Sequence, residues 1–126
     1  MTTDGAGQDI VDQLVSAYNA RRTDVLSELY HPDVTYWSCL SGTSEGRAAV
    51  IENIERLHIA LPDEQMRAKT VTADADVIVA EFQSSGTDSG GRPYQIDFTE
   101  VFQLVDGKVA SIKVYIDPDD VATISH

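Results

Sequence analysis

The chain has 126 residues, with nine basic and twenty-one acidic side chains and a formal net charge of −12. This length suits one domain with a hydrophobic core of its own. The acidic balance argues against nucleic acids and membranes as partners, because both reward a basic surface. No apolar run approaches the roughly 20 residues of a membrane-spanning helix. The single cysteine, Cys39, rules out an internal disulfide and fits a cytoplasmic protein.

The first seven residues carry neither the basic segment nor the apolar segment of a signal peptide. We therefore expect residues 1–7 to be a disordered tail. Residues 8–126 contain no internal repeat and no low-complexity tract, so we expect them to form a single domain.

The N-terminal half of the chain shows mostly helical periodicity, with apolar residues at spacings of three and four. Thr23 is a candidate cap for the second helix, and Pro32 stops that helix. The predicted elements of this half are a helix over Gln8–Ala20, a short helix over Asp24–Tyr30, a short strand over Val34–Ser38, a Gly- and Ser-rich loop over Cys39–Gly46 and a helix over Arg47–Leu61.

The C-terminal half alternates apolar and polar residues with a period of two, which is typical of half-buried strands. The pair Asp106-Gly107 is a strong hairpin signal. The predicted elements are strands over Gln65–Ala73, Asp76–Ser85, Tyr94–Val105 and Lys108–Asp117, then one helical turn in Pro118–Ile124. Three helices followed by a four-strand antiparallel meander indicate an α+β fold. The sheet should curl around the helices, because all four strands must share one core.

The alternation also assigns the side chains that face this core. They are Met66, Ala68 and Thr70 on the first strand of the meander, Ile78, Ala80, Phe82 and Ser84 on the second, Ile96, Phe98, Glu100, Phe102 and Leu104 on the third, and Ile112, Val114 and Ile116 on the last. Glu100 is the one carboxylate in these stripes. An ionised carboxylate there costs several kcal/mol unless it is paired or protonated. Glu100 therefore either has a buried partner or lines a cavity.

Several short motifs, each weak alone, occur in a specific order along the chain. They are Tyr18-Asn-Ala, Leu29-Tyr-His-Pro-Asp-Val-Thr-Tyr, Gly46-Arg-Ala-Ala-Val-Ile, Phe102-Gln-Leu-Val-Asp-Gly-Lys-Val and Ile112-Lys-Val-Tyr-Ile-Asp. With these motifs the chain resembles the nuclear transport factor 2-like superfamily, and most of all its SnoaL-like and ketosteroid isomerase branches. The resemblance implies a cone of curved antiparallel sheet, closed by helices around an apolar pocket, and a homodimer formed through the outer sheet face. It does not define one activity, because this scaffold hosts many.

The resemblance to ketosteroid isomerases can be followed at three positions. The protonated acid that those enzymes carry on the penultimate strand corresponds to Glu100. Their general-base aspartate corresponds to Ser38, and their oxyanion-binding tyrosine aligns with Leu14. Two of the three parts are missing, so steroid double-bond isomerisation is not expected.

Glu100 is the best remaining candidate for a catalytic residue. A desolvated glutamate has a raised pKa and can exchange protons near neutral pH. Two alternatives involve no chemistry: the carboxyl group could be bonded to Tyr18, Tyr36 or His58, or a bulge could turn it to the exposed face.

Three further residues are candidates for assisting Glu100. His58 lies on the apolar stripe of the third helix, where it could shuttle protons or simply be a satisfied core-edge histidine. The hydroxyl of Tyr36 could orient a carbonyl group, or could pack with one satisfied bond. Asp117 resembles the acid/base aspartate of SnoaL-type cyclases. However, Asp117-Pro118-Asp119-Asp120 is also a helix start with an Asp cap, and capping is the favoured interpretation.

The side chains expected to contact a substrate are mostly apolar and face the interior. They are Leu14, Tyr18, Ser38, Ile54, Leu57, Met66, Phe82, Ser84, Phe98, Val114 and Ile116. We find no metal-binding or cofactor-binding motif, so we expect no metal and no cofactor.

The sequence and the resemblance together favour a cofactor-independent acid/base enzyme. It would be an isomerase, an aldol-type cyclase or a dehydratase that acts on an apolar cyclic or polyketide-like carbonyl compound, with Glu100 as the principal acid/base. The alternative is a small-molecule binding or assembly module without chemistry. In either case we expect a homodimer, because the outward sheet faces mix apolar and polar residues. The apolar ones are Val71, Val79, Val101 and Tyr115.

Overall fold

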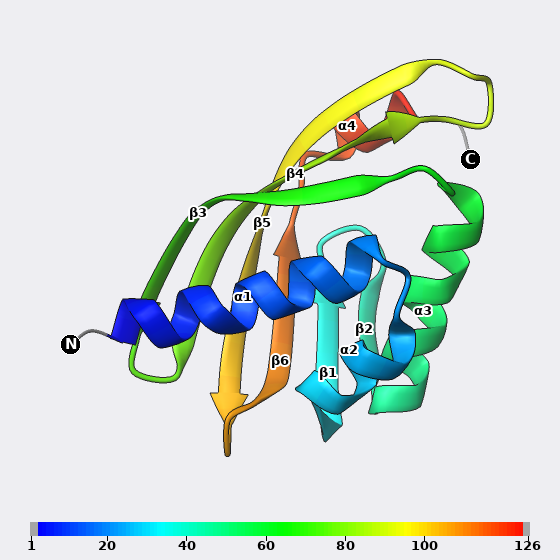
Figure 1. The fold of residues 1–126 in the computed structure, drawn as a ribbon. Helices are drawn as coiled ribbons and strands as arrows, with labels where there is room; N and C mark the ends of the chain where they lie inside the picture. The colour runs from blue at the N-terminus through cyan, green and yellow to red at the C-terminus, as the bar shows by residue number, and fades with distance from the viewer. Residues whose placement is uncertain (1–2, 125–126) are drawn as a thin grey trace.

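The computed structural model describes residues 3–124 and has the expected α+β fold, with four helices and six strands in this part of the chain (Figure 1). The elements are α1 (Thr3–Asn19), α2 (Thr23–Leu29), β1 (Tyr30–Ser38), β2 (Gly42–Glu45), α3 (Arg47–Ala60), β3 (Gln65–Asp74), β4 (Val77–Thr87), β5 (Pro93–Val105), β6 (Lys108–Tyr115) and α4 (Pro118–Ala122). The strands form one sheet in the order β2-β1-β6-β5-β4-β3.

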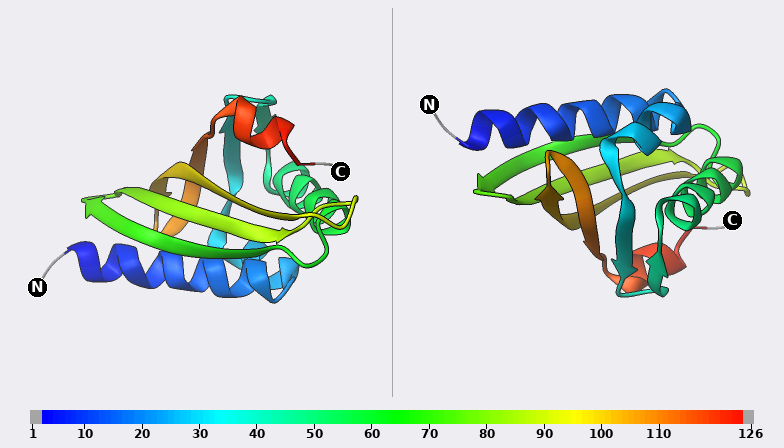
Figure 2. Two further views of the ribbon diagram at one scale, coloured as in Figure 1. Left: turned by 90° about the horizontal axis from the view of Figure 1, so that it is seen from above. Right: turned by 90° about the horizontal axis from the view of Figure 1, so that it is seen from below.

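The sheet is strongly curved, and the helices close its concave side (Figure 2). Helix α1 lies along β3, and α3 lies beside β1 and β2. Helix α4 follows β6 and lies near the turn between β1 and β2 (Figure 2). No helix within residues 3–124 is long and apolar enough to cross a membrane.

Helix α1 begins earlier than the sequence pattern predicted. It starts at Thr3 instead of Gln8, so residues 3–7 of the predicted tail are helical. Residues 1 and 2 of that tail lie outside the described residues. Gly7, in this added part of α1, is buried where the helix meets the sheet, and a Cβ there would lie 2.6 Å from the Cβ of Ala73. The apolar face of α1 continues into the core through Val11 and Leu14.

The start of α2 corrects a second prediction. The N-cap is Arg22, which makes no side-chain capping bond, and Thr23 is already the first helical residue. Thr23 is therefore not the cap. Arg21 has a positive φ of 60°, so the chain turns sharply between α1 and α2 without a capping hydroxyl.

The sheet differs from the predicted one in its first two strands. The strand predicted over Val34–Ser38 begins at Tyr30, and the predicted loop Cys39–Gly46 contains β2. Strand β1 pairs antiparallel with β2 but parallel with β6, so the sheet is mixed and not wholly antiparallel. The parallel pairing is possible because most of the chain separates the two strands and provides the crossover.

The meander β3–β6 is antiparallel as predicted, but its first strand contains a bulge. Ala68 pairs with Phe82, whereas Thr70 pairs with Glu81, so Lys69 is an extra residue in β3. The bulge exchanges the two faces beyond it. Thr70 is exposed and Val71 packs against the core, which reverses the predicted orientation of both. On β4 the alternation holds, since Ile78, Ala80, Phe82 and Ser84 are all buried.

Candidate functional site

An interior cavity of about 330 Å³ lies between the helices and the concave face of the sheet. Its lining includes Glu100, Tyr36 and all eleven side chains that the sequence predicted to contact a substrate, namely Leu14, Tyr18, Ser38, Ile54, Leu57, Met66, Phe82, Ser84, Phe98, Val114 and Ile116. Leu40 and Leu57 also line it and are 45% and 37% exposed, which places the mouth of the cavity between the β1–β2 turn and α3. The geometry fits a ligand site, and binding by these residues stays a prediction.

Glu100 lies in the middle of β5, between Ala80 on β4 and Val114 on β6. Its carboxyl group accepts no hydrogen bond from any residue among 3–124. The side chain of Glu100 is half-buried, and its exposed part borders the cavity. Protein surrounds the rest of it. Desolvation, with a smaller contribution from the charge of Glu64, raises the pKa of Glu100 to about 8. The carboxyl group is therefore mostly protonated at pH 7.

Glu64 is a second carboxylate on the same cavity, and sequence analysis did not find it. It lies in the turn between α3 and β3 and is only 5% exposed. The hydroxyl of Tyr18 donates to its Oε1 at 2.5 Å, and the hydroxyl of Ser84 donates to its Oε2 at 2.5 Å. Two predicted lining residues thus hold Glu64 in place, whereas Glu100 has no such support.

Tyrosines contribute most of the other polar groups on the cavity wall. Burial raises the pKa of Tyr30 and of Tyr36, and the charge of Glu100 raises both further. Burial also raises the pKa of Tyr18, with added effects of its bond to Glu64. These hydroxyls therefore keep their protons and can act as donors near Glu100. Tyr94 lines the cavity as well.

His58 does not line the cavity. Its ring packs edge-on against the ring of Tyr18, with 4.5 Å between the ring centroids. Burial, followed by the charge of Arg21, lowers the pKa of His58, so the imidazole is neutral at pH 7. Its Nε2 is buried without a hydrogen-bond partner in the described part of the chain. Any effect of His58 on the cavity therefore passes through Tyr18.

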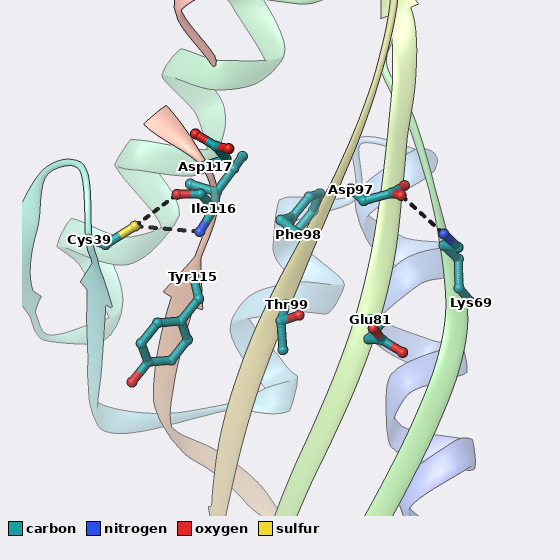
Figure 3. Close-up of a pocket in the computed structure, with 9 residues that line it drawn as sticks. All are labelled: Cys39, Lys69, Glu81, Asp97, Phe98, Thr99, Tyr115, Ile116 and Asp117. Carbon is teal, nitrogen blue, oxygen red and sulfur yellow. Dashed lines mark hydrogen bonds and ion pairs between the residues drawn. The ribbon is translucent and has the colours of Figure 1, made fainter. Parts of the chain in front are cut away.

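Asp117 is the N-cap of α4, where its side chain accepts a hydrogen bond from the Asp119 backbone N–H at 2.9 Å. It lines a second hollow, on the outer face of the sheet, and not the interior cavity (Figure 3). This outer hollow measures about 420 Å³ but is open, and it includes the ion pair between Lys69 and Asp97 at 3.1 Å. The structure does not bring Asp117 and Glu100 into one site.

The two positions that lack ketosteroid isomerase residues have structural roles of their own. Ser38 is buried, and its hydroxyl accepts a hydrogen bond from the Leu40 backbone N–H at 3.1 Å, which shapes the β1–β2 turn. Leu14 contributes an apolar side chain to the cavity wall. Among residues 3–124, no three His, Cys, Asp or Glu side chains gather in an arrangement suited to a metal ion.

The curved sheet, its helical cover and the interior cavity define a nuclear transport factor 2-like, ketosteroid isomerase-like fold. The profile of one family, described as the SnoaL-like domain, matches residues 11–112. The chain belongs to the SnoaL-like family. A comparison with curated proteins found no match.

Solved structures with the same fold share little sequence with this chain. A proposed polyketide cyclase from Xanthomonas campestris pv. campestris superposes with a TM-score of 0.88 at 20% identity, covering 98% of both chains. A ketosteroid isomerase-like protein from Catenulispora acidiphila, solved with trimethylamine, gives 0.83 at 19% identity over 92% of this chain and 91% of its own. TerC, crystallised with polyporic acid, gives 0.84 at 17% identity over 94% and 97%. These likenesses establish the fold.

Proposed function

We propose that the chain is a cofactor-independent acid/base enzyme that acts on an apolar cyclic or polyketide-like carbonyl compound. The reaction would be an isomerisation, an aldol-type cyclisation or a dehydration. The observation that carries the proposal is Glu100, a carboxyl group without a hydrogen-bond partner on a largely apolar cavity, with a pKa of about 8. A carboxyl group kept neutral at pH 7 can donate its proton to a carbonyl oxygen as negative charge develops there.

Proton transfer from carbon also requires a base, and Glu64 fits that role. Its charge reaches Glu100, and the hydroxyls of Tyr18 and Ser84 hold its carboxyl group in place on the cavity wall. In this proposal Glu100 is the acid and Glu64 is the base, while the hydroxyl of Tyr36 orients the carbonyl group. His58 positions Tyr18, and Asp117 keeps its role as a helix cap.

The comparisons support a small-molecule function of this kind. One structural neighbour is described as a proposed polyketide cyclase, and two others were crystallised with polyporic acid and with trimethylamine. A cavity of about 330 Å³ is large enough for one compact organic molecule.

The proposal is tested with Glu100→Gln, which keeps the shape of the side chain and removes its titration. A panel of cyclic ketones and enones is incubated with the protein in D₂O, and exchange of the protons next to the carbonyl is followed by NMR. We expect the variant to lose 10²- to 10⁴-fold in rate, the usual range for a general acid or base. The matched control is Glu45→Gln, which makes the same substitution at an exposed position on β2. A rate within about threefold of the wild type in Glu100→Gln would clear Glu100 of the role.

A second candidate function is a binding module without chemistry. The specific observation in its favour is the pair Ser38 and Leu14, which occupy the positions of a base and an oxyanion-binding tyrosine in ketosteroid isomerases. Mass spectrometry of the protein incubated with the same panel distinguishes the two functions. Stable binding of a ketone, with no exchange above the Glu100→Gln background, would support the binding module.

A further inference from the structure

The interior cavity contains two carboxyl groups and no basic group to pair with them. Among residues 3–124, Glu64 and Glu100 line it, whereas no lysine, arginine or histidine does. The groups bonded to Glu64 are the neutral hydroxyls of Tyr18 and Ser84. A buried carboxylate without a positive partner is costly, and a cation that enters the cavity removes that cost.

The basic groups nearest to the cavity are already engaged or neutral. The guanidinium of Arg21 donates to the backbone carbonyls of Leu61 and Pro62, at 3.4 and 2.7 Å, and forms no salt bridge with Glu64. His58 lies behind Tyr18 and is neutral at pH 7. Neither Arg21 nor His58 lines the cavity, and neither forms a salt bridge with Glu64 or Glu100.

The rest of the cavity wall suits an organic cation better than an inorganic one. Four tyrosine rings border the cavity, and the faces of such rings attract ammonium groups. Most of the remaining lining is aliphatic or Phe, including Leu14, Ile54 and Phe98, which would bury an apolar body. An anionic ligand would meet two carboxyl groups and no positive charge.

We propose that the interior cavity selects an apolar organic amine, bound as its ammonium ion beside Glu64 and Glu100, with its apolar part against the aliphatic wall. The inference rests on the assignment of this cavity as the ligand site in the proposed function, and it adds the charge of the ligand.

Binding of a cation should be coupled to the titration of Glu100. Four titratable groups face it: Tyr18 from α1, Tyr30 and Tyr36 from β1, and Glu64 from the turn before β3. Its direct partners in the sheet, Ala80 and Val114, do not titrate. The tyrosines keep their protons, so the ammonium ion displaces the proton of Glu100, which passes to the buffer. The carboxylate that remains pairs with the ligand.

The test uses three probes with one apolar body: 1-aminoadamantane, adamantane-1-carboxylate and 2-adamantanone. Calorimetric titrations at pH 6, 7, 8 and 9, in two buffers of different ionisation enthalpy, give the affinity and the protons released. At pH 7 we expect the amine to bind at least tenfold more tightly than the carboxylate, and to release close to one proton per molecule bound. The affinity for the amine should rise from pH 6 to pH 9, because Glu100 loses its proton over this range. The amine stays charged throughout, since its own pKa is near that of lysine, about 10.4.

Two variants make the test specific. Glu100→Gln should weaken amine binding about 10- to 100-fold, the loss expected for one charge-assisted contact, and should abolish proton release. The circular dichroism spectrum of Glu100→Gln should match that of the wild type, which shows that the variant is folded. Glu45→Gln should change nothing. Equal or tighter binding of the carboxylate, or amine binding unaffected by Glu100→Gln, would overturn the inference.

The outcomes also separate this inference from the proposed function. If the ketone bound as tightly as the amine, the cavity would not select a positively charged ligand. The inference would then fail, and the proposed function would stand. Binding of the amine with no Glu100-dependent exchange in ketones would support the inference and reject the acid/base role. If none of the three probes bound, the inference would fail together with the cavity's assignment as the ligand site.

Discussion

Glu64 and Glu100 are two glutamates on one cavity wall with opposite surroundings. Glu64 accepts two short hydrogen bonds, whereas Glu100 accepts none from the described residues. Desolvation without a hydrogen bond favours the neutral form of Glu100. In the proposed function Glu100 is therefore the acid, and Glu64, held by two hydroxyls, is the base.

The raised pKa of Glu100 predicts that stability falls with rising pH. The ordinary pKa of a glutamate is 4.5, and that of Glu100 in the folded protein is about 8. Between these values the folded state keeps a proton that the unfolded state has lost. The free energy of unfolding therefore decreases by roughly 1.4 kcal/mol per pH unit in this window, and the loss is complete above the folded pKa.

Urea denaturation at pH 5, 6, 7 and 8 measures this dependence. The difference between wild type and Glu100→Gln isolates one group, because all other titrating side chains, such as His58, are common to both proteins. We expect the variant to gain stability relative to the wild type as the pH rises. Parallel pH dependences in the two proteins would contradict the raised pKa.

Sequence analysis found only one of the two glutamates, and the reason is physical. Glu100 stands out because it interrupts an alternating apolar stripe of β5, and a period of two is readable from the sequence. Glu64 follows Pro62 and Asp63 in a turn, where no periodicity indicates which way a side chain points. Its burial depends on Tyr18 and Ser84, which lie 46 and 20 residues away in the sequence.

For the helices and strands too, the sequence predicted the features that local periodicity determines and missed those that depend on distant parts of the chain. The three N-terminal helices and the meander follow from local periodicity, and the sequence predicted them with shifts at their ends. The bulge in β3 has no local signal, because Lys69, Thr70 and Val71 can alternate in either register. The pairing of β1 with β6 depends on the whole chain, since β6 is one of the last elements to be made.

The docking of α1 on the sheet depends on the missing side chain of Gly7. We expect Gly7→Ala to destabilise the protein by about 1–3 kcal/mol, because the new methyl group would lie 2.6 Å from the Cβ of Ala73. The matched variant is Gly7→Ala combined with Ala73→Gly, which removes the atom in the way. Urea denaturation of both single variants and the double variant gives the coupling. A double variant less stable by the full sum of the two single losses would contradict this contact.

At the scale of the whole molecule, the outer face of the sheet is the surface proposed for the homodimer. Val79, Val101 and Lys113 are in register across β4, β5 and β6 on this face. Tyr115, which is 48% exposed, packs against Trp37 with 5.3 Å between the ring centroids. Val71, predicted to belong to this face, packs against the core because of the bulge in β3.

We predict that the protein is a dimer at micromolar concentration in moderate salt, where the repulsion caused by a net charge of −12 is screened. Val79→Glu should give a monomer, because a two-fold interface places the new charge near its own copy. Val105→Glu, at the exposed end of β5, serves as the control and should remain a dimer. Light scattering distinguishes the two states, and a monomeric wild type would end the proposal.

The central claim is that Glu100 is a neutral acid in the cavity at pH 7. The most direct test is an NMR titration of the protein labelled with ¹³C at the glutamate carboxyl carbons, with Glu100→Gln used to assign the resonance. We predict that the Glu100 signal titrates with a midpoint near 8, well above the ordinary glutamate value of 4.5. A midpoint near 4.5 for Glu100 would mean that its carboxyl group is ionised at pH 7, and would contradict the claim.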